Sequence, residues 1–361
     1  MGLSSMGVGA QDKIKNILSF LVPTFFHKPS YNLTTSCGTI HQQLCETLYG
    51  IHPVLCALSF HQRNIKQLYV KDISSKTKDS DSLVEQSLFQ IIEEALRFNI
   101  PITHVSVEKL KVLSNSRSHQ GVLLEVSPII IHPISNLSIR NLLHSWRNPS
   151  EKYFPFVKKN NRPIILLLDH ISDVMNFGSI LRSAAFFGVS AVLLSTAPCV
   201  APSPLISKLS VGAMEGMLFY RLTDTVMDMK SLSDAGFLIV GTCGESQISP
   251  NAISKPLNCL QPNEVGVNDC NNNTGILPRP MVLALGSESR GLSENVLNAC
   301  DLLLRVPGLA DTTNLVNKSI SQNIPSSLNV AVAAGILLYQ LTMYRHGCEA
   351  ANTSSFVFHK E

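Results

Sequence analysis

The clearest pattern in the chain is a series of uninterrupted apolar runs separated by helical and polar stretches. The runs at Ile164–Leu168 and Ala191–Leu194 are typical of strands buried on both faces in a parallel sheet. Between them, a helical pattern extends to about Phe187, and Gly188 follows where a left-handed residue commonly ends a helix. Three more runs predict further strands: Phe237–Val240, Met281–Leu285 and Leu302–Val306. With a closing helix over Leu328–Leu341, this alternation predicts an α/β domain with a parallel sheet.

A second, smaller α/β unit is predicted upstream, over residues 45–128. Its strongest element is a helix over Leu83–Phe98, whose apolar side chains fall on one stripe and which Pro101 closes. Other elements expected in this unit are a helix over His52–Phe60 and strands at Gln67–Val70, Ile102–Val105 and Gly121–Val126.

These units suggest two domains, as expected for 361 residues. Residues 129–162 contain several prolines and no sustained periodicity, so we expect a linker there, followed by the larger domain over residues 163–346. Polar insertions are predicted at residues 245–280 and 308–323. Residues 1–44 form an N-terminal extension and residues 347–361 a C-terminal tail.

Composition restricts the possible classes of protein. A hydrophobic content of 45% supports a large core, and a charged content of only 15% argues against a largely disordered chain. The net charge of +3 is too small to indicate nucleic-acid binding, so any RNA contact would require a local basic patch. The nine cysteines are scattered without a CxxC pair, which predicts reduced thiols and no metal site.

The first forty residues contain a candidate targeting signal. The apolar run Ile17–Phe26 is too short to span a bilayer, so we expect no membrane anchor there. Asp12 and the lack of a clear cleavage site argue against a secretory signal peptide. Lysines, many Ser and Thr residues and few acids are typical of a mitochondrial transit peptide, although arginine is missing.

Three polar clusters follow predicted strands or precede a predicted helix. They are Asn176–Arg182 (NFGSILR), Gly286–Leu292 (GSESRGL) and the start of Ser327–Ile336 (SLNVAVAAGI). Ligands of open α/β sheets bind beyond the carboxyl ends of the strands, which is where these clusters are expected. The glycine spacing matches neither a dinucleotide fingerprint nor a P-loop, which disfavours a nucleotide-binding oxidoreductase.

Each cluster also has a purely structural interpretation. Asn176, Ser327 and Asn329 are residue types that cap helices, and Glu288 could favour a helix dipole. Arg182 could extend its head to solvent or form a salt bridge. The functional alternative is that its guanidinium binds a phosphate or a substrate hydroxyl.

In this order, the three clusters resemble the signature of the SpoU/TrmH family of S-adenosylmethionine-dependent RNA 2′-O-methyltransferases. The resemblance covers about Ile164–Arg345. Upstream, Tyr49–Val54 (YGIHPV) and His119–Val122 (HQGV) resemble the ends of the ribosomal-protein-like RNA-binding domain found in many members. The branch that the chain resembles most is that of the mitochondrial ribosomal RNA methyltransferases, similar to bacterial enzymes that methylate a guanosine ribose in large-subunit rRNA.

The resemblance implies a SPOUT fold, in which the C-terminal segment is threaded as a trefoil knot. It further implies a homodimer formed through the knotted region, with the helix Val330–Leu341 at the interface. The implied S-adenosylmethionine site is lined mainly by backbone groups of Leu285, Gly286, Val306 and Leu328, with Thr242 and Gly244 near its rim. Because the link between Pro307 and Ser327 is longer than in most members, Ile324 or Pro325 could take the place of Val306.

The same resemblance assigns the catalytic residues. Arg182 would activate the ribose 2′-hydroxyl or hold the neighbouring phosphate, with another group accepting the proton because arginine stays protonated. Asn176, Glu288, Ser327 and Asn329 would organise Arg182, the ribose and the knot loops. A transfer RNA substrate, or a catalytically inactive RNA-binding assembly factor on the same fold, are the alternatives.

Overall fold

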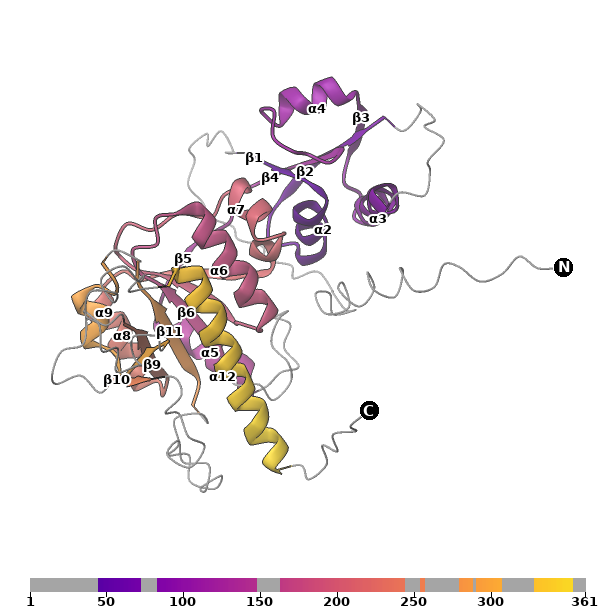
Figure 1. Cartoon of the computed structure of the whole chain (residues 1–361). Helices are drawn as coiled ribbons and strands as arrows, with labels where there is room; N and C mark the ends of the chain where they lie inside the picture. Colours follow the sequence, from indigo (N-terminus) through magenta and orange to yellow (C-terminus); the bar gives the residue numbers. More distant parts are fainter. Residues whose placement is uncertain are drawn as a thin grey trace, which may run out of the picture.

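The computed structural model describes residues 45–72, 83–147, 163–243, 254–256, 279–287, 290–306 and 328–352. The predicted N-terminal extension, most of the 245–280 insertion and the whole 308–323 insertion lie outside these residues. The described chain forms two α/β domains joined side by side (Figure 1). None of the helices within it is long and apolar enough to cross a membrane.

The N-terminal domain is built on a four-stranded sheet in the order β1-β4-β2-β3. The strands are β1 (Glu46–Tyr49), β2 (Ile65–Lys71), β3 (Ile102–Val105) and β4 (Val122–Val126). Helices α2 (Ile51–Phe60) and α3 (Leu83–Arg97) bury their apolar stripes against one face of this sheet. The short α4 (Val107–Leu113) covers the other face through Leu110, so both faces of this sheet contribute to the core.

The C-terminal domain contains an eight-stranded sheet in the order β10-β12-β9-β11-β6-β7-β8-β5, and every pairing in it is parallel. Its strands are β6 (Ile164–Leu168), β7 (Ala191–Leu194), β8 (Leu218–Arg221), β9 (Leu238–Thr242), β11 (Met281–Leu285), β12 (Leu302–Arg305) and the short β5 (His132–Pro133) and β10 (Ser254–Pro256). Strand β11 lies between β6 and β9, and all five of its side chains are buried, as the apolar run predicted.

Helices cover both faces of this sheet. One face packs against α6 (Val174–Phe186), α7 (Pro204–Leu209), the 3₁₀ turn η1 (Ala213–Gly216) and α12 (Val330–Asn352). The other face packs against α5 (Asn136–Arg147), α8 (Thr225–Asp234) and α9 (Glu294–Asn298). Gly188 follows α6 with φ of 73°, which confirms the predicted left-handed end of that helix.

The expected linker is wrong over much of its length. Within residues 129–162, β5 pairs with β8, and α5 packs Ile139 and Leu142 into the core of the C-terminal domain. The helix was missed because the prolines around it indicated a linker. Its apolar positions also extend over only about three turns between Pro133 and Pro149, which is too short for a clear helical period.

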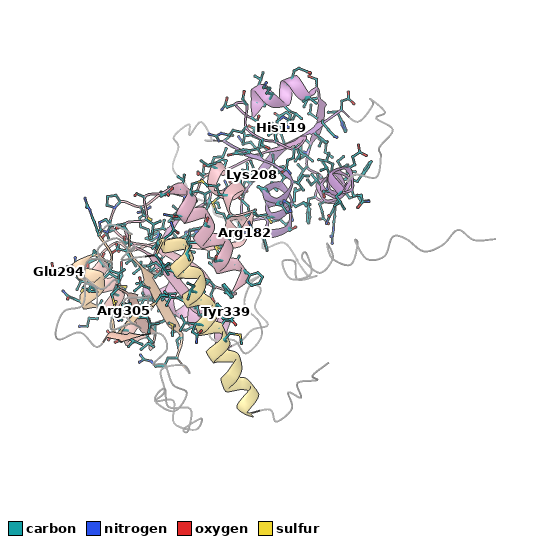
Figure 2. The ribbon with its side chains drawn as sticks, viewed as in Figure 1. His119, Arg182, Lys208, Glu294, Arg305 and Tyr339 are labelled. Atoms are coloured by element: carbon teal, nitrogen blue, oxygen red, sulfur yellow. The ribbon has the colours of Figure 1, made fainter. Side chains whose placement is uncertain are left out.

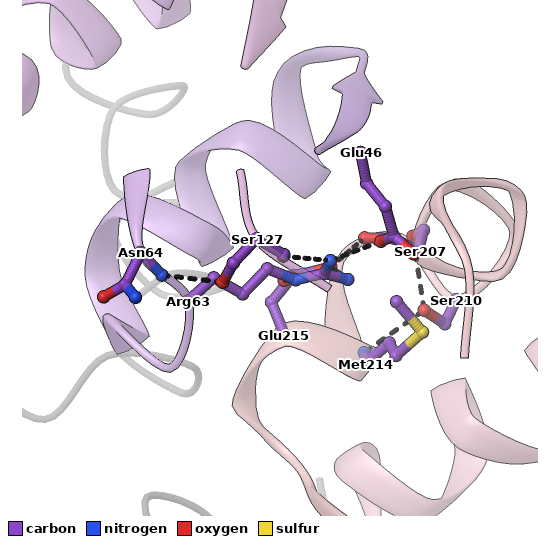
Figure 3. Close-up of polar contacts among 8 residues, drawn as sticks. All are labelled: Glu46, Arg63, Asn64, Ser127, Ser207, Ser210, Met214 and Glu215. Carbon is purple, nitrogen blue, oxygen red and sulfur yellow. Dashed lines mark hydrogen bonds and ion pairs between the residues drawn. The ribbon is translucent and has the colours of Figure 1, made fainter. Parts of the chain in front are cut away.

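The two domains meet at a buried ion pair (Figure 3). Arg63 donates from Nε and Nη2 to the two carboxylate oxygens of Glu215, at 2.7 and 3.0 Å. Its Nη1 donates to Glu46 at 2.6 Å and to the Ser127 carbonyl at 3.0 Å. Glu215 lies in η1, and its Oε1 also accepts the Ser207 hydroxyl of α7 at 2.7 Å. The junction therefore fixes the N-terminal domain on α7 and η1.

Candidate functional site

Four of the predicted cofactor residues, Thr242, Leu285, Gly286 and Val306, lie at the ends of three adjacent strands. Strands β12, β9 and β11 are neighbours, with Leu304 beside Thr242 in one pair and Ala284 beside Gly241 in the other. Their carboxyl ends therefore meet at one edge of the sheet, where Thr242, Leu285 and Val306 end or follow the strands. The Thr242 hydroxyl donates to the Ala284 carbonyl at 3.1 Å and so joins β9 to β11 at this edge.

After β11 the backbone folds back on itself in a tight loop. Ser287 and Gly291 exchange two backbone hydrogen bonds, of 3.1 and 2.8 Å. A Cβ atom on Gly286 would overlap the backbone of Gly291 and Leu292, so only glycine fits there. Gly291 has φ of 67°, a second position in this loop that favours glycine.

A residue that we did not predict holds this loop against β6. Asp169 follows β6 directly and is fully buried, and its Oδ2 accepts the backbone N–H of Ser293 at 2.6 Å. The sequence does carry a signal for it, because Asp169 is the first polar residue after an uninterrupted apolar strand. A buried carboxylate in this position fixes the loop that begins at Gly286 relative to the loop that precedes α6.

The first and third polar clusters contact each other directly. Asn329 Nδ2 donates to Asn176 Oδ1 at 2.9 Å, which joins residues 153 positions apart in the sequence. Asn329 also caps α12, because its Oδ1 accepts the backbone N–H groups of Ala331 and Val332 at 2.9 and 3.3 Å. The capping role considered for Asn329 is therefore confirmed, and the same side chain contacts the first cluster through Asn176.

The capping role considered for Asn176 is wrong. Helix α6 begins at Val174, and its N-cap is Asp173, whose carboxylate accepts the Met175 N–H at 2.8 Å. Asn176 therefore lies within the first turn, where its side chain reaches Asn329. Aspartate is as good an N-cap as asparagine, and Asp173 is the residue that stands directly before the first residue of this helix.

Arg182 lies on a different face of α6 from Asn176. Six residues of helix correspond to about 9 Å along the axis and about 120° around it. Arg182 is exposed, and none of the described residues forms a hydrogen bond or ion pair with it, so the salt-bridge interpretation is not supported. It lies near His52 of α2, and the pKa of that imidazole is lowered by partial loss of hydration and then by the charges of Lys208 and Arg182.

The remaining predicted site residues are only partly described. Leu328 directly precedes Asn329 and is 48% exposed, although its side chain is apolar. Val306 is half-buried and packs against the core below α12. Gly244, Glu288 and Ser327, together with the alternatives Ile324 and Pro325, lie outside the described residues, so their roles stay predictions.

Comparison with known proteins gives one consistent result across both domains. The model of the SpoU rRNA methylase family matches residues 163–339. A second family model, described as RNA 2′-O ribose methyltransferase substrate binding, matches residues 47–130. Together these two matches account for the two domains in the order in which they occur along the chain.

Individual relatives agree with the family models. The human protein named rRNA methyltransferase 1, mitochondrial, is 30% identical over 84% of this chain and 74% of its own length. The Pseudomonas putida 23S rRNA (guanosine-2′-O-)-methyltransferase RlmB is 25% identical over 83% of this chain and 97% of its own length. An AdoMet-bound rRNA methyltransferase structure from Sinorhizobium meliloti, at 17% identity, has a TM-score of 0.54 over 83% of this chain and 87% of that one, which shows a common fold.

Proposed function

The chain belongs to the SpoU rRNA methylase family, and we propose that it methylates the ribose 2′-hydroxyl of a guanosine in mitochondrial large-subunit rRNA, with S-adenosylmethionine as the methyl donor. The observation that supports this most directly is the hydrogen bond between Asn176 and Asn329. It joins the first and third motif clusters, while Asp169, in the loop that precedes α6, binds Ser293 directly after the second cluster. These contacts support the proposal that the three clusters form one site.

The described residues fit S-adenosylmethionine at this edge of the sheet. Strand ends offer backbone N–H and C=O groups, and the Gly286 loop brings such groups close together because no side chain intervenes. Val306 and Leu328 add apolar surface, and Leu328 is exposed shortly before α12 begins. We propose that Thr242, Leu285, Gly286, Val306 and Leu328, with Gly244, hold this cofactor, which supplies a methyl group activated by a sulfonium.

The protein's own contribution is to orient the ribose and stabilise charge. A 2′-hydroxyl is a weak nucleophile and requires activation by hydrogen bonding or by a base. A guanidinium offers hydrogen-bond donors and no acceptor, so the role that we propose for Arg182 is to hold the phosphate beside the target ribose and to donate hydrogen bonds to the hydroxyl oxygen. Asn176, Glu288, Ser327 and Asn329 then fix the loops that present the ribose, and the proton passes to another group or to solvent.

The separation between Arg182 and the asparagine pair has a consequence for substrate placement. Because the two lie on different faces of α6, we propose that the target ribose and a neighbouring nucleotide share these contacts. We therefore propose that the RNA strand runs along α6 between Asn176 and Arg182. This path leads from the sheet edge toward α2 and α7 of the domain junction, where the proposed RNA-binding domain begins.

The substrate class is inferred from the relatives. The human and Pseudomonas putida proteins carry names that specify rRNA. The name of the second protein also specifies 23S rRNA and a guanosine 2′-O position. A Bacillus subtilis relative, 25% identical over 267 residues, is named a putative tRNA/rRNA methyltransferase, so tRNA is the second candidate. Ribose-methylation mapping of mitochondrial and cytosolic RNA after depletion of the protein separates the two. Loss of no methyl group in either pool would contradict the proposal.

We further propose that the enzyme is a homodimer that buries one face of α12. The apolar side chains Val332, Ile336, Tyr339 and Met343 recur at helical spacing and are 36–52% exposed. Phe186, at the end of α6, is 82% exposed beside them, and its ring contacts Phe187, which in turn contacts Tyr339. A second copy of the chain is the partner that we propose for this stripe, because the stripe carries no charge. Around a twofold axis, the stripes of the two copies would pack against each other and both would be buried.

The trefoil knot and the mitochondrial location complete the proposal. The position of β11 between β6 and β9, and of α12 against α6, supports a threaded C-terminal segment, whose preceding residues 307–327 lie outside those described. The mitochondrial location is supported by the names of relatives from Homo sapiens and Schizosaccharomyces pombe. N-terminal sequencing of the protein isolated from cells tests it, and a mature chain that starts at Met1 would contradict the transit peptide.

A further inference from the structure

A lysine at the domain junction has no assigned function in the site described above. Lys208 lies in the last turn of α7 and is half-buried. Its Nζ donates to Gln120 Oε1 of the N-terminal domain at 2.7 Å, and the same oxygen accepts the backbone N–H of Ile51 at 3.3 Å. No carboxylate among the described residues pairs with Lys208. The Lys208 ammonium therefore spans the domain junction, and its hydrogen-bond acceptor there is the neutral amide of Gln120.

The backbone around this ammonium is held in unusual conformations. Gly50 has φ of 96°, and the next segment along this surface contains Gln120 at 54° and Gly121 at 85°. A Cβ atom on Gly50 would overlap Lys208 Nζ, so the ammonium occupies space that only glycine leaves open. Gln120 is not a glycine, so its left-handed conformation costs free energy and persists where the surrounding structure requires it, which is common at binding sites.

Lys208 and Arg182 are two cations that both act on His52. His52 of α2 experiences the positive charges of both Lys208 and Arg182, and burial lowers the pKa of Lys208 itself. In Figure 2, Lys208 lies between His119 of the N-terminal domain and Arg182 of α6. Like charges held together without a carboxylate repel one another, and a bound anion would offset that repulsion.

We propose that Lys208 and Gln120 bind a backbone phosphate of the RNA strand whose ribose lies beside Arg182, so that Lys208 is a positioning residue. An ammonium has three donors, and Gln120 occupies one of them, which leaves two for phosphate oxygens. With Oε1 committed to Lys208 and Ile51, the Gln120 amide group presents its N–H donors to the same anion. This inference rests on the proposed RNA substrate and adds to it a specific contact.

The domain junction holds Lys208 and Gln120 at a fixed distance from each other. Arg63 and Glu215 fix the N-terminal domain on η1, which directly follows the loop after α7. Because Lys208 and Gln120 come from different domains, the phosphate site exists only when the domains are joined in this way. The RNA strand would thus be held at two points, Lys208 and Arg182, with the target ribose placed by both.

The test compares Lys208→Met with Lys230→Met, a matched loss of an exposed lysine on α8, on the other face of the sheet. The probe is a fluorescein-labelled RNA hairpin of rRNA sequence, and its affinity is measured by anisotropy over a series of salt concentrations. Loss of one phosphate contact lowers the slope of log K against log salt by about 0.7, which corresponds to about fivefold weaker binding at 0.1 M salt. Lys230→Met should retain the wild-type slope.

A steady-state assay distinguishes positioning from a merely structural role. For Lys208→Met we expect KM for RNA to rise about fivefold while KM for S-adenosylmethionine stays unchanged. Gln120→Ala should shift the RNA affinity in the same direction by a smaller factor, which keeps the inference testable if the lysine variant folds poorly. Equal salt slopes for wild type and Lys208→Met would overturn the phosphate site alone. Failure of the wild type to bind or methylate RNA would instead overturn the proposed function.

Discussion

Replacing Arg63 by methionine should destabilise the protein strongly, because it removes a cation and leaves its partner buried. The side chains of Arg63 and Glu215 are each only 1% exposed, and they meet through two parallel hydrogen bonds. The same guanidinium also pairs with Glu46 and with the Ser127 carbonyl. Methionine retains most of the volume of the arginine stem, so the change tests the charge and its hydrogen bonds more than packing.

The expected magnitude follows from the uncompensated carboxylate. Removing one member of a buried ion pair costs about 3–5 kcal/mol, since the remaining charge has lost its partner but not its burial. At about 2–4 °C per kcal/mol for a chain of this size, the melting temperature should fall by about 6–20 °C. Because the lost contacts cross the domain junction, the N-terminal domain should unfold before the C-terminal one.

The pH dependence of this deficit has a defined sign. Burial raises the pKa of Glu215 above its usual value of 4.5, while Arg63 and Ser207 lower it. Without Arg63 the pKa rises further, so the folded state binds a proton that the unfolded state has released. Stability then falls as the pH rises above about 4.5, and the deficit of Arg63→Met should be small in acid and large at pH 8.

Urea unfolding followed by tryptophan fluorescence and by circular dichroism, at several pH values, measures this effect. The control is the double variant Arg63→Met/Glu215→Gln, in which no charge is left buried. It should recover most of the loss, with a coupling of at least 2 kcal/mol in the double-mutant cycle. A single variant as stable as the wild type at pH 8, or a double variant no more stable than the single, would refute this reasoning.

Three further changes test the site and the dimer. Gly286→Ala should abolish S-adenosylmethionine binding in calorimetry, because the new Cβ would overlap the backbone of Gly291 and Leu292. The control for an added methyl group is Gly335→Ala inside α12, where the nearest atom to the new Cβ is the Ser183 hydroxyl at 3.9 Å. Asn329→Ala should cost about 1–2 kcal/mol of stability through the lost cap and lower methyl transfer more than cofactor affinity; unchanged transfer would contradict its role in the site. Ile336→Glu should convert the dimer into a monomer in light scattering, whereas Met227→Glu, at an exposed apolar residue of α8, should not; a wild-type monomer would contradict the dimer.

The buried parts of the fold were predictable because burial on both faces leaves a direct trace in the sequence. Strands β6, β7 and β11 appear as uninterrupted apolar runs with the bounds that the structure shows. The sequence pattern predicted no helix or strand between β7 and β9, where the structure has α7, η1, β8 and α8. Helix α7 has only six residues and η1 only four, which is too short for a helical period to become visible.

The site was predictable as a set of clusters but not as a geometry. The contact between Asn176 and Asn329 joins positions 153 residues apart, and the pair Arg63–Glu215 joins positions 152 apart. No local pattern encodes such distances; only the order of the motifs indicated that the asparagines belong together. The placement of Arg182 toward α2 and Lys208 depends on how the two domains join, which the sequence does not display.

The most direct test of the proposed function is methyl transfer by the purified protein. RNA transcribed from the mitochondrial large-subunit rRNA gene is incubated with S-adenosylmethionine carrying a labelled methyl group, digested to nucleosides and separated by mass spectrometry. We expect the label in 2′-O-methylguanosine with the wild type and no label there with Arg182→Ala, although this variant should still bind S-adenosylmethionine. Label on a base, or full activity of Arg182→Ala, would contradict it.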